Sequence, residues 1–176
     1  VKKFEKGTKV IDVAKSISEG LARKVISATF NKEAYEIESE LYFDGNIKFH
    51  TWEDEEGKQA FWHSSAHILA QTIKFFYPKC KLTIGPSIEN GFYYDVDFGE
   101  DAISEKDFKK IEEKFLEFAR LDSQFEMKSI SKNDALDFYK KENNQYKIEL
   151  IDGLDDGTIT FCDHSDFSDL CKGGHI

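Results

Sequence analysis

The first fifty residues show short apolar and β-branched runs around one stretch with helical spacing. That stretch is Val10–Ile17, for which Thr8 is the expected N-cap. Lys24–Phe30 is rich in β-branched residues and is predicted to be a strand. Weaker strand patterns occupy Val1–Glu5, Ile37–Tyr42 and Gly45–Trp52. This order of one helix among short strands is typical of a small ubiquitin-like, or β-grasp, module.

A different pattern begins after the acidic run Glu53–Gly57. Glu55–Phe76 is predicted to be one long helix, because acidic residues in its first turn complement the helix dipole and Pro78 ends it. Asn90-Gly91 lies between two β-rich runs and predicts a hairpin. Two amphipathic helices are expected next, at Ser104–Arg120 and Ser131–Glu142, each begun by a serine with an aspartate three residues later.

The first of these amphipathic helices should bury a stripe made of Phe108, Ile111, Phe115 and Phe118. Tyr146–Ile151 is predicted to be a strand or a short helix, and the polar tail after it shows no clear period. Together the patterns predict an α+β protein with two domains. Residues 1–54 would form the β-grasp domain, and residues 55–176 an α+β domain whose long helix packs on an antiparallel sheet.

Composition and charge narrow the functional classes. Hydrophobic residues make up 40% of the chain, which supplies enough apolar surface for a folded core. The net charge of -10 is unfavourable for tight, autonomous binding to nucleic acid, which usually requires a basic patch. No apolar run approaches the roughly 20 residues of a membrane span, so no membrane partner is expected. Three cysteines without a secretory segment predict reduced thiols and a cytoplasmic location.

Two pairs of metal-binding or catalytic side chains stand out. His63 and His67 lie four residues apart in W-H-S-S-A-H, which places both imidazoles on one face of the predicted helix. Cys171 and His175 have the same separation in C-K-G-G-H, where the glycines favour a loop. Three histidines and a cysteine suit a tetrahedral zinc site, and they suit acid–base chemistry around a water equally well. Packing alone is the remaining alternative. An H-E-x-x-H zinc protease is excluded, because Ser64 follows the first histidine.

These residues belong to a longer set of motifs. W-H-S-S-A-H-I-L-A, I-G-P-S-I-E-N-G-F-Y-Y-D-V, Y-K-I and D-L-C-K-G-G-H resemble, in this order, the editing domain of threonyl-tRNA synthetases. The region before Glu53 resembles the TGS domain that precedes it in that family, so the resemblance covers nearly the whole chain. The second motif separates this family from alanyl-tRNA editing proteins, which share the two histidine and cysteine pairs.

The resemblance implies a function for seven residues. The implied catalytic residues are His63, His67, Lys147, Cys171 and His175, and the implied substrate-binding residues are Tyr94 and Asp169. Ser65 stands where many relatives have cysteine, and Gly174 where many have proline. Simpler explanations remain open for these residues. Lys147 would then be a solvated surface lysine and Tyr94 a core residue. Asp163, Asp166 and Asp169 would belong to a solvated acidic loop. His50 and His164 belong to no motif and are expected to be structural.

The implied activity is proofreading. The site would hydrolyse the ester of mischarged seryl-tRNA(Thr), with His63 activating the water and Lys147 stabilising the oxyanion. Its partners would be the acceptor end of the tRNA and the rest of a synthetase chain, which is expected to form a homodimer. Editing would need no cofactor, while ATP, magnesium and zinc would serve the ligase domain of the longer protein. The alternatives are a zinc-dependent deacylase using His63, His67, Cys171 and His175 as ligands, and a non-catalytic RNA-binding or regulatory TGS module.

Overall fold

A computed structural model describes residues 1–176 as a mixed α/β structure with six helices and several small antiparallel sheets. The chain divides into two compact units, Val1–Ser64 with Gly173–Ile176, and Ser65–Lys172. The helices are α1 (Val10–Ile17), α2 (Glu19–Ala22), α3 (Glu55–Phe76), α4 (Glu105–Ala119), α5 (Lys132–Lys141) and α6 (Gln145–Asp152). The division falls inside α3, and the expected domain boundary after residue 54 stays a prediction.

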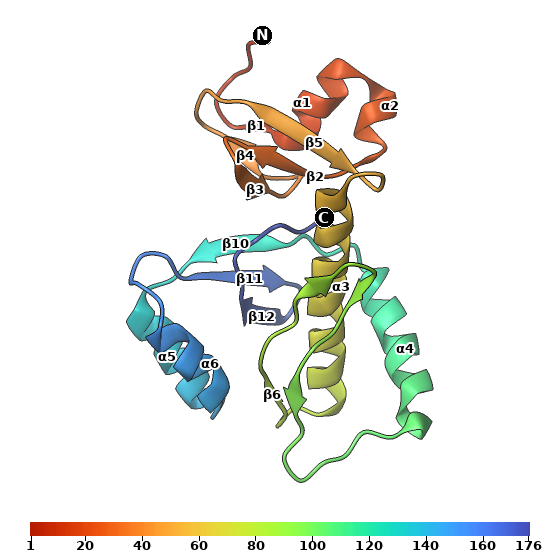
Figure 1. The fold of residues 1–176 in the computed structure, drawn as a ribbon, viewed down its shortest axis with the longest axis vertical. Helices are drawn as coiled ribbons and strands as arrows, with labels where there is room; N and C mark the ends of the chain where they lie inside the picture. Colours follow the sequence, from red (N-terminus) through yellow and green to blue (C-terminus); the bar gives the residue numbers. More distant parts are fainter. The chain divides into compact units, whose positions relative to one another are not determined.

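The first unit contains a three-stranded antiparallel sheet in the order β3-β2-β5 and a separate pair, β1 with β4. Its strands are β1 (Thr8–Lys9), β2 (Val25–Phe30), β3 (Glu33–Tyr35), β4 (Glu40–Leu41) and β5 (Ile47–Thr51). Helix α1 packs against β2, burying Val10 and Ala14 on one side and Val25 and Ala28 on the other (Figure 1). The predicted helix and the strand at 25–30 are confirmed, while the β-grasp arrangement stays a prediction.

Two predictions for the N-terminal segment are wrong. Val1–Glu5 forms no strand, and the first paired residues are Thr8 and Lys9. Thr8 does not cap α1: its hydroxyl donates to the carbonyl of Glu5 at 2.7 Å, and Lys9 occupies the N-cap position. The chain turns at Gly7, where φ is 84°, so the residues before it run outside the β1–β4 ladder.

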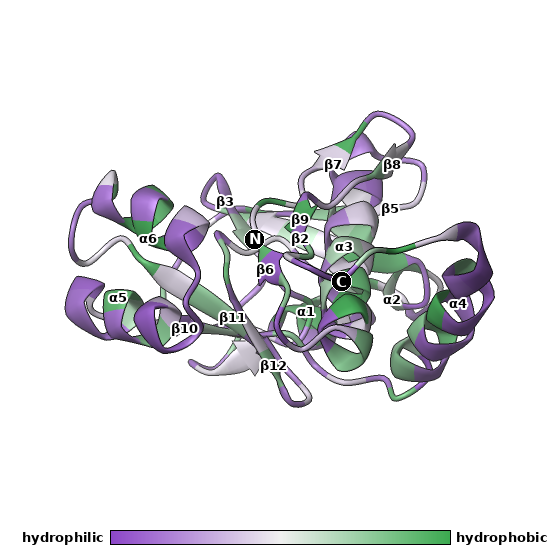
Figure 2. Ribbon diagram, turned by 90° about the horizontal axis from the view of Figure 1, so that it is seen from below, coloured by the Kyte–Doolittle hydropathy of each residue, from purple (hydrophilic) through white to green (hydrophobic).

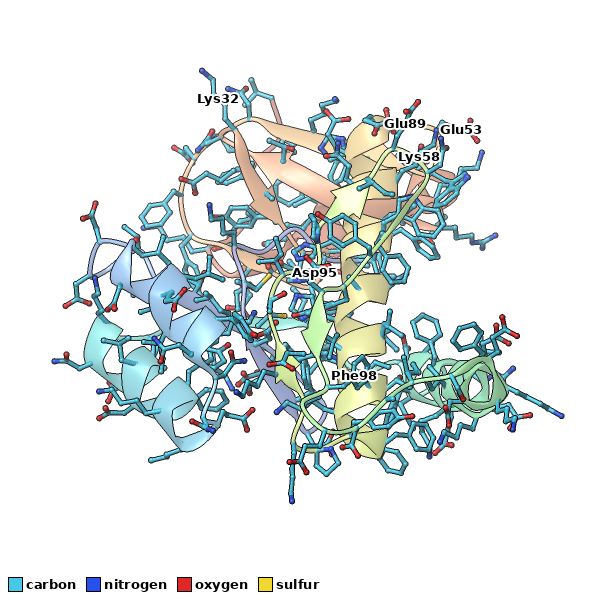
Figure 3. The ribbon with its side chains drawn as sticks, turned by 60° about the horizontal axis from the view of Figure 1, so that its bottom comes forward. Lys32, Glu53, Lys58, Glu89, Asp95 and Phe98 are labelled. Carbon is cyan, nitrogen blue, oxygen red and sulfur yellow. The ribbon has the colours of Figure 1, made fainter.

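Strand β3 was not predicted because its turn lacks the usual glycine. Phe30 and Glu33 pair directly, so Asn31 and Lys32 form a two-residue hairpin turn, with φ values of 51° and 76°. Turns of this kind favour Asn-Gly, and a lysine in the second position hides the signal. Lys32 points away from the sheet (Figure 3). The predicted strand at 37–42 is reduced to the two residues of β4.

The second unit is built around the C-terminal part of α3. Its strands are β6 (Lys81–Leu82), β7 (Ser87–Ile88), β8 (Gly91–Phe92), β9 (Val96–Asp97), β10 (Glu126–Ser129), β11 (Thr160–His164) and β12 (Phe167–Leu170). One buried cluster joins Ala70 and Ile73 of α3 to Leu82, Ile111 and Phe167. A long helix against antiparallel strands is therefore confirmed for this unit. Phe98 packs beside this cluster, with its ring 5.2 Å from that of Tyr77 (Figure 3).

A second cluster lies between α5, α6 and the three-stranded sheet β10-β11-β12. Ala135 and Tyr139 of α5 pack with Ile151 of α6 and Phe161 of β11. Helices α5 and α6 lie side by side, and α5 has hydrophobic residues along one side and hydrophilic ones along the other (Figures 1 and 2). The three strands, two of them in the polar tail, were not predicted. Of the two structures proposed for residues 146–151, the helix is the one observed.

The predicted helix bounds are confirmed to within a residue or two, but the predicted buried face of α4 is not observed. Ser104 and Ser131 are the N-caps of α4 and α5, and α3 has the predicted bounds. The expected apolar stripe of α4 is wrong, because only Ile111 is buried and Phe108 is 51% exposed. The hairpin is confirmed, but its turn residues are Glu89 and Asn90. None of the helices combines the length and apolar character that crossing a membrane requires.

Candidate functional site

A buried carboxylate is the centre of a polar network in the second unit. Asp169 lies on β12, and its side chain is 4% exposed. Its Oδ1 accepts from Lys147 Nζ at 2.7 Å and from the hydroxyl of Tyr139 at 2.8 Å. Its Oδ2 accepts from the hydroxyl of Tyr94 at 2.6 Å. Three donors from three other segments therefore hold one carboxylate, which leaves Oδ2 with capacity for one more hydrogen bond.

Lys147 is fixed by the start of α6. Asn144 is the N-cap, and its side-chain oxygen accepts from the backbone N–H of Lys147 at 3.2 Å. The amide group of Asn144 also donates to the carbonyl of Leu82 at 2.8 Å, which ties the helix start to β6. The lysine is 3% exposed. It is therefore not the solvated surface lysine that its sequence position allowed.

Tyr94 lies in the extended segment between β8 and β9, against Gly85. A Cβ atom on Gly85 would lie 2.3 Å from the ring of Tyr94, so any larger residue at 85 would displace the tyrosine. This close approach places the I-G-P segment directly against the F-Y-Y segment. Tyr94 also packs against the buried cluster of α3. Tyr94 is therefore both a partly buried core residue and a hydrogen-bond donor to Asp169.

Burial and Asp169 hold both tyrosines in their protonated form. Burial, reinforced by the charge of Asp169, raises the pKa of Tyr94 well above its usual value. The same two causes raise the pKa of Tyr139. Both phenols therefore remain hydrogen-bond donors even at pH values where an exposed tyrosine loses its proton. Tyr139 also accepts from the backbone N–H of Leu170 at 2.8 Å, which fixes its hydroxyl next to β12.

His67 has two neighbours that its motif did not indicate. The candidate ligand atoms of His67, Cys162 and His164 all lie within 4.8 Å of one another, and all three residues are buried. The rings of His67 and His164 are 5.9 Å apart, edge to face. Cys162 and His164 are two residues apart on β11, so they share one face of the strand. That spacing was the available signal, and it was missed because β11 itself was not predicted.

Cys171 follows β12 directly and is held by its backbone. Its N–H donates to the carbonyl of Thr160 at 3.0 Å, and its carbonyl accepts from the hydroxyl of the same threonine. The residue is 7% exposed. Cys80 is also buried, which raises the pKa of its thiol to about 11, so it has little thiolate at neutral pH. None of the cysteines forms a disulfide.

The other two predicted histidines lie in the first unit. His63 is on α3, and its ring stacks on that of His175, with centroids 4.5 Å apart and planes 29° apart. The tail is anchored where Ile176 donates its N–H to the hydroxyl of Ser64 at 3.0 Å. His175 is fully buried. Its Nδ1 lies 3.2 Å from Glu36 Oε1, a contact that the sequence did not indicate.

One polar hollow lies in the second unit, near the β11–β12 turn. Its volume is about 290 Å³, and its lining residues are Gln124, Glu126, Lys128, Asp163, His164, Ser165, Asp166 and Ser168. The single lysine is engaged by Asp163 at 2.6 Å. Three carboxylates and no unengaged cation make this hollow unsuitable for phosphate groups.

These placements define what the residues can do chemically. Lys147 and Asp169 form a buried ion pair that orients two phenol donors, and His63 and His175 form a stacked imidazole pair. Imidazole side chains can take up and release protons in general acid–base chemistry, and the lysine and the phenols can stabilise a developing negative charge. Imidazole and thiolate groups, such as those of His63, His67, His175 and Cys171, also have the donor chemistry that zinc requires.

The sequence of this chain is similar to those of tRNA ligases. The relatives are threonine–tRNA ligases: that of Flavobacterium psychrophilum is 57% identical over 176 residues, that of Cytophaga hutchinsonii 47% over 176 residues, and that of Clostridioides difficile 46% over 177 residues. Each match covers 100% of this chain but only 27% or 28% of the relative. The chain thus spans about a quarter of the length of these ligases. No family model matches it.

Proposed function

We propose that this chain is the proofreading segment of a threonyl-tRNA synthetase and hydrolyses the ester of seryl-tRNA(Thr). The end-to-end similarity to threonine–tRNA ligases supports the parent enzyme. The observation that carries the hydrolytic role is the buried network of Asp169, Lys147, Tyr94 and Tyr139. Burying an ion pair contributes little to stability, so a pair this well enclosed is better explained by a function.

A second site is needed because serine is smaller than threonine. A binding pocket built for threonine gains only about 1–3 kcal/mol of discrimination from one methyl group. A hydrolytic pocket that admits serine and rejects the extra methyl removes the remaining error. The unused capacity of Asp169 Oδ2 suits the ammonium or hydroxyl group of a seryl ester, because a buried carboxylate favours such donors.

The histidines would supply the proton transfers. We propose that His63, His67, Cys171 and His175 act on the ester, because the motifs that resemble the editing domain carry them as two pairs, each four residues apart. His63 would activate the water, while His67 and His175 orient water and substrate. Lys147 would stabilise the oxyanion, and Cys171 would contact the substrate or the leaving hydroxyl. No metal ion or cofactor is required in this scheme.

The net charge of -10 limits what the chain does alone. The phosphates of tRNA repel an acidic surface, so most of the affinity would come from the remainder of the synthetase, including its partner in a dimer. Hydrolysis by the 176-residue chain should therefore be measured under single-turnover conditions, with the protein in large excess and at low ionic strength.

The test compares wild type, His63→Ala and Gln59→Ala on seryl-tRNA(Thr) and threonyl-tRNA(Thr). Gln59 is exposed one turn before His63 on α3, so its variant controls for a changed helix. The wild type and Gln59→Ala should hydrolyse only the seryl ester, and His63→Ala should be about 10²–10⁴-fold slower. Metal content is determined for the same samples. A folded His63→Ala variant with the wild-type rate would refute the assignment, and a rate that requires bound zinc would favour the metal-dependent deacylase.

A further inference from the structure

Glu36 makes several contacts with the C-terminal tail within the first unit. It follows β3 and is 8% exposed. Its Oε1 accepts from the backbone N–H of Gly174 at 3.1 Å and lies 3.2 Å from Nδ1 of His175. The backbone N–H of His175 donates to the same oxygen over a longer distance, 3.5 Å. Ser39 donates its hydroxyl to Oε2 at 3.3 Å. One carboxylate thus contacts both the ring and the backbone of a proposed catalytic residue.

The hydrogen bonds of Glu36 indicate which nitrogen of His175 carries a proton. Burial disfavours the carboxylate, but the hydrogen bond from His175 and the backbone donors outweigh this effect and hold the pKa of Glu36 below its usual value. Oε1 of Glu36 already accepts from the backbone N–H of Gly174, so it is an acceptor toward the ring of His175 as well. Nδ1 of His175 must be the donor, so Nε2 is the acceptor atom in the neutral ring.

Glu36 adds to the anchoring of a tail whose two glycines are conformationally permissive. Gly173 and Gly174 have φ values of 87° and 88°, a region that glycine enters freely. A proline at 174 would have no N–H and a φ near -65°, so it could not make the contact with Glu36. The glycine in this chain therefore creates a hydrogen bond to Glu36 in place of the rigidity that proline would provide.

We propose that Glu36 is a positioning residue that fixes the Nδ1–H tautomer and the orientation of His175, so that Nε2 is the atom that acts on water or substrate. Its catalytic consequence rests on the function proposed above, whereas the tautomer itself does not. A carboxylate behind a histidine in the same way fixes the tautomer of metal-ligating histidines, where losing the carboxylate typically costs about 10–100-fold in affinity or activity.

The first experiment reads the tautomer directly by ¹⁵N-detected NMR of the histidine rings in the 176-residue chain. The His175→Ala variant identifies the signals of His175. Wild type should show Nδ1 protonated and Nε2 unprotonated at neutral pH. Glu36→Ala should populate the Nε2–H form, and Glu36→Gln should largely keep the Nδ1–H form, because its amide oxygen still accepts. Glu38→Ala is the matched control, since Glu38 lies two residues away and pairs with Lys9 at 2.8 Å.

The second experiment measures single-turnover hydrolysis of seryl-tRNA(Thr) by wild type and by the Glu36→Ala, Glu36→Gln and Glu38→Ala variants. Glu36→Ala should be about 10–100-fold slower with equal substrate binding, Glu36→Gln should recover most of that loss, and Glu38→Ala should match wild type. Circular dichroism confirms that each variant is folded. An unchanged His175 tautomer in folded Glu36→Ala would overturn the proposal, as would an unchanged rate. If wild type itself does not hydrolyse the ester, the proposed function fails, while the tautomer result still decides the role of Glu36.

Discussion

Replacing Lys147 with methionine should destabilise the protein more than neutralising both members of its ion pair. Lys147 and Asp169 are 3% and 4% exposed and 2.7 Å apart, so their mutual screening by water is small. Methionine fills a similar volume but leaves the Asp169 carboxylate buried without a countercharge. An uncompensated buried charge of this kind costs about 3–5 kcal/mol. The hydroxyls of Tyr94 and Tyr139 still donate to it, which favours the lower end of that range.

The double variant Lys147→Met with Asp169→Asn should lose less. Its asparagine oxygen still accepts from a tyrosine, and no charge remains buried, so a loss of about 1–2 kcal/mol is expected from the altered hydrogen bonds. The two substitutions should therefore show a coupling energy of at least about 1 kcal/mol in a double-mutant cycle. Lys140→Met is the control, because Lys140 pairs with Asp137 at the surface, where both side chains are more than half exposed. Its variant should change stability by less than about 0.5 kcal/mol.

Urea unfolding followed by far-ultraviolet circular dichroism measures these differences. With a urea dependence of about 1–3 kcal/mol per molar, a loss of 3 kcal/mol lowers the midpoint by about 1–3 M. The result also matters for the catalytic test, because the activity of any Lys147 variant has to be compared at equal folded fraction. If Lys147→Met is as stable as wild type, or if the double variant is the less stable one, the ion pair is not buried as described and the reasoning fails.

Two further predictions concern the tyrosine network and the β2–β3 turn. The unfolded chain loses the Tyr139 proton near pH 10 while the folded chain retains it, so stability should fall as the pH rises above about 10. In urea unfolding, the free energy of unfolding of Tyr139→Phe should fall less steeply with pH than that of wild type, by about 1.4 kcal/mol per pH unit. An unchanged pH dependence would contradict this prediction. Lys32→Gly should raise the free energy of unfolding by up to about 1 kcal/mol, because it relieves a positive φ of 76°. Thermal unfolding should shift upward by a few degrees, and a lower melting temperature would refute the strain argument.

The helices could be predicted from the sequence because their signals are local. Acidic residues in the first turn and Pro78 beyond the end fixed the bounds of α3, and Ser104 and Ser131 marked the starts of two others. The buried stripe of α4 was mispredicted because periodicity shows which residues share a face, not whether another element covers it. Phe118 does contact Phe75, with ring centroids 5.9 Å apart, but Phe75 is itself 56% exposed.

The strands of the polar tail could not be predicted from the sequence, because some of their polar residues are buried. An alternating pattern predicts a strand when polar residues face water. In β11 and β12, His164 and Asp169 face the interior instead, and the pairing of Cys162 with Asp169 places two chemically useful side chains opposite each other in the ladder. The burial of Asp169 depends on Lys147 and two tyrosines from distant segments, so no local window contains the reason for it.

The same argument explains why motifs identified the candidate histidine but not the residue behind it. His175 belongs to a recognisable short sequence, whereas its partner Glu36 precedes it by 139 residues and lies in a segment with no motif. A boundary drawn at residue 54 treats the N-terminal part as a separate module. The last four residues of the chain nevertheless belong to the same compact unit as Glu36. A functional boundary based on sequence continuity would therefore separate a proposed catalytic residue from the carboxylate that sets its tautomer.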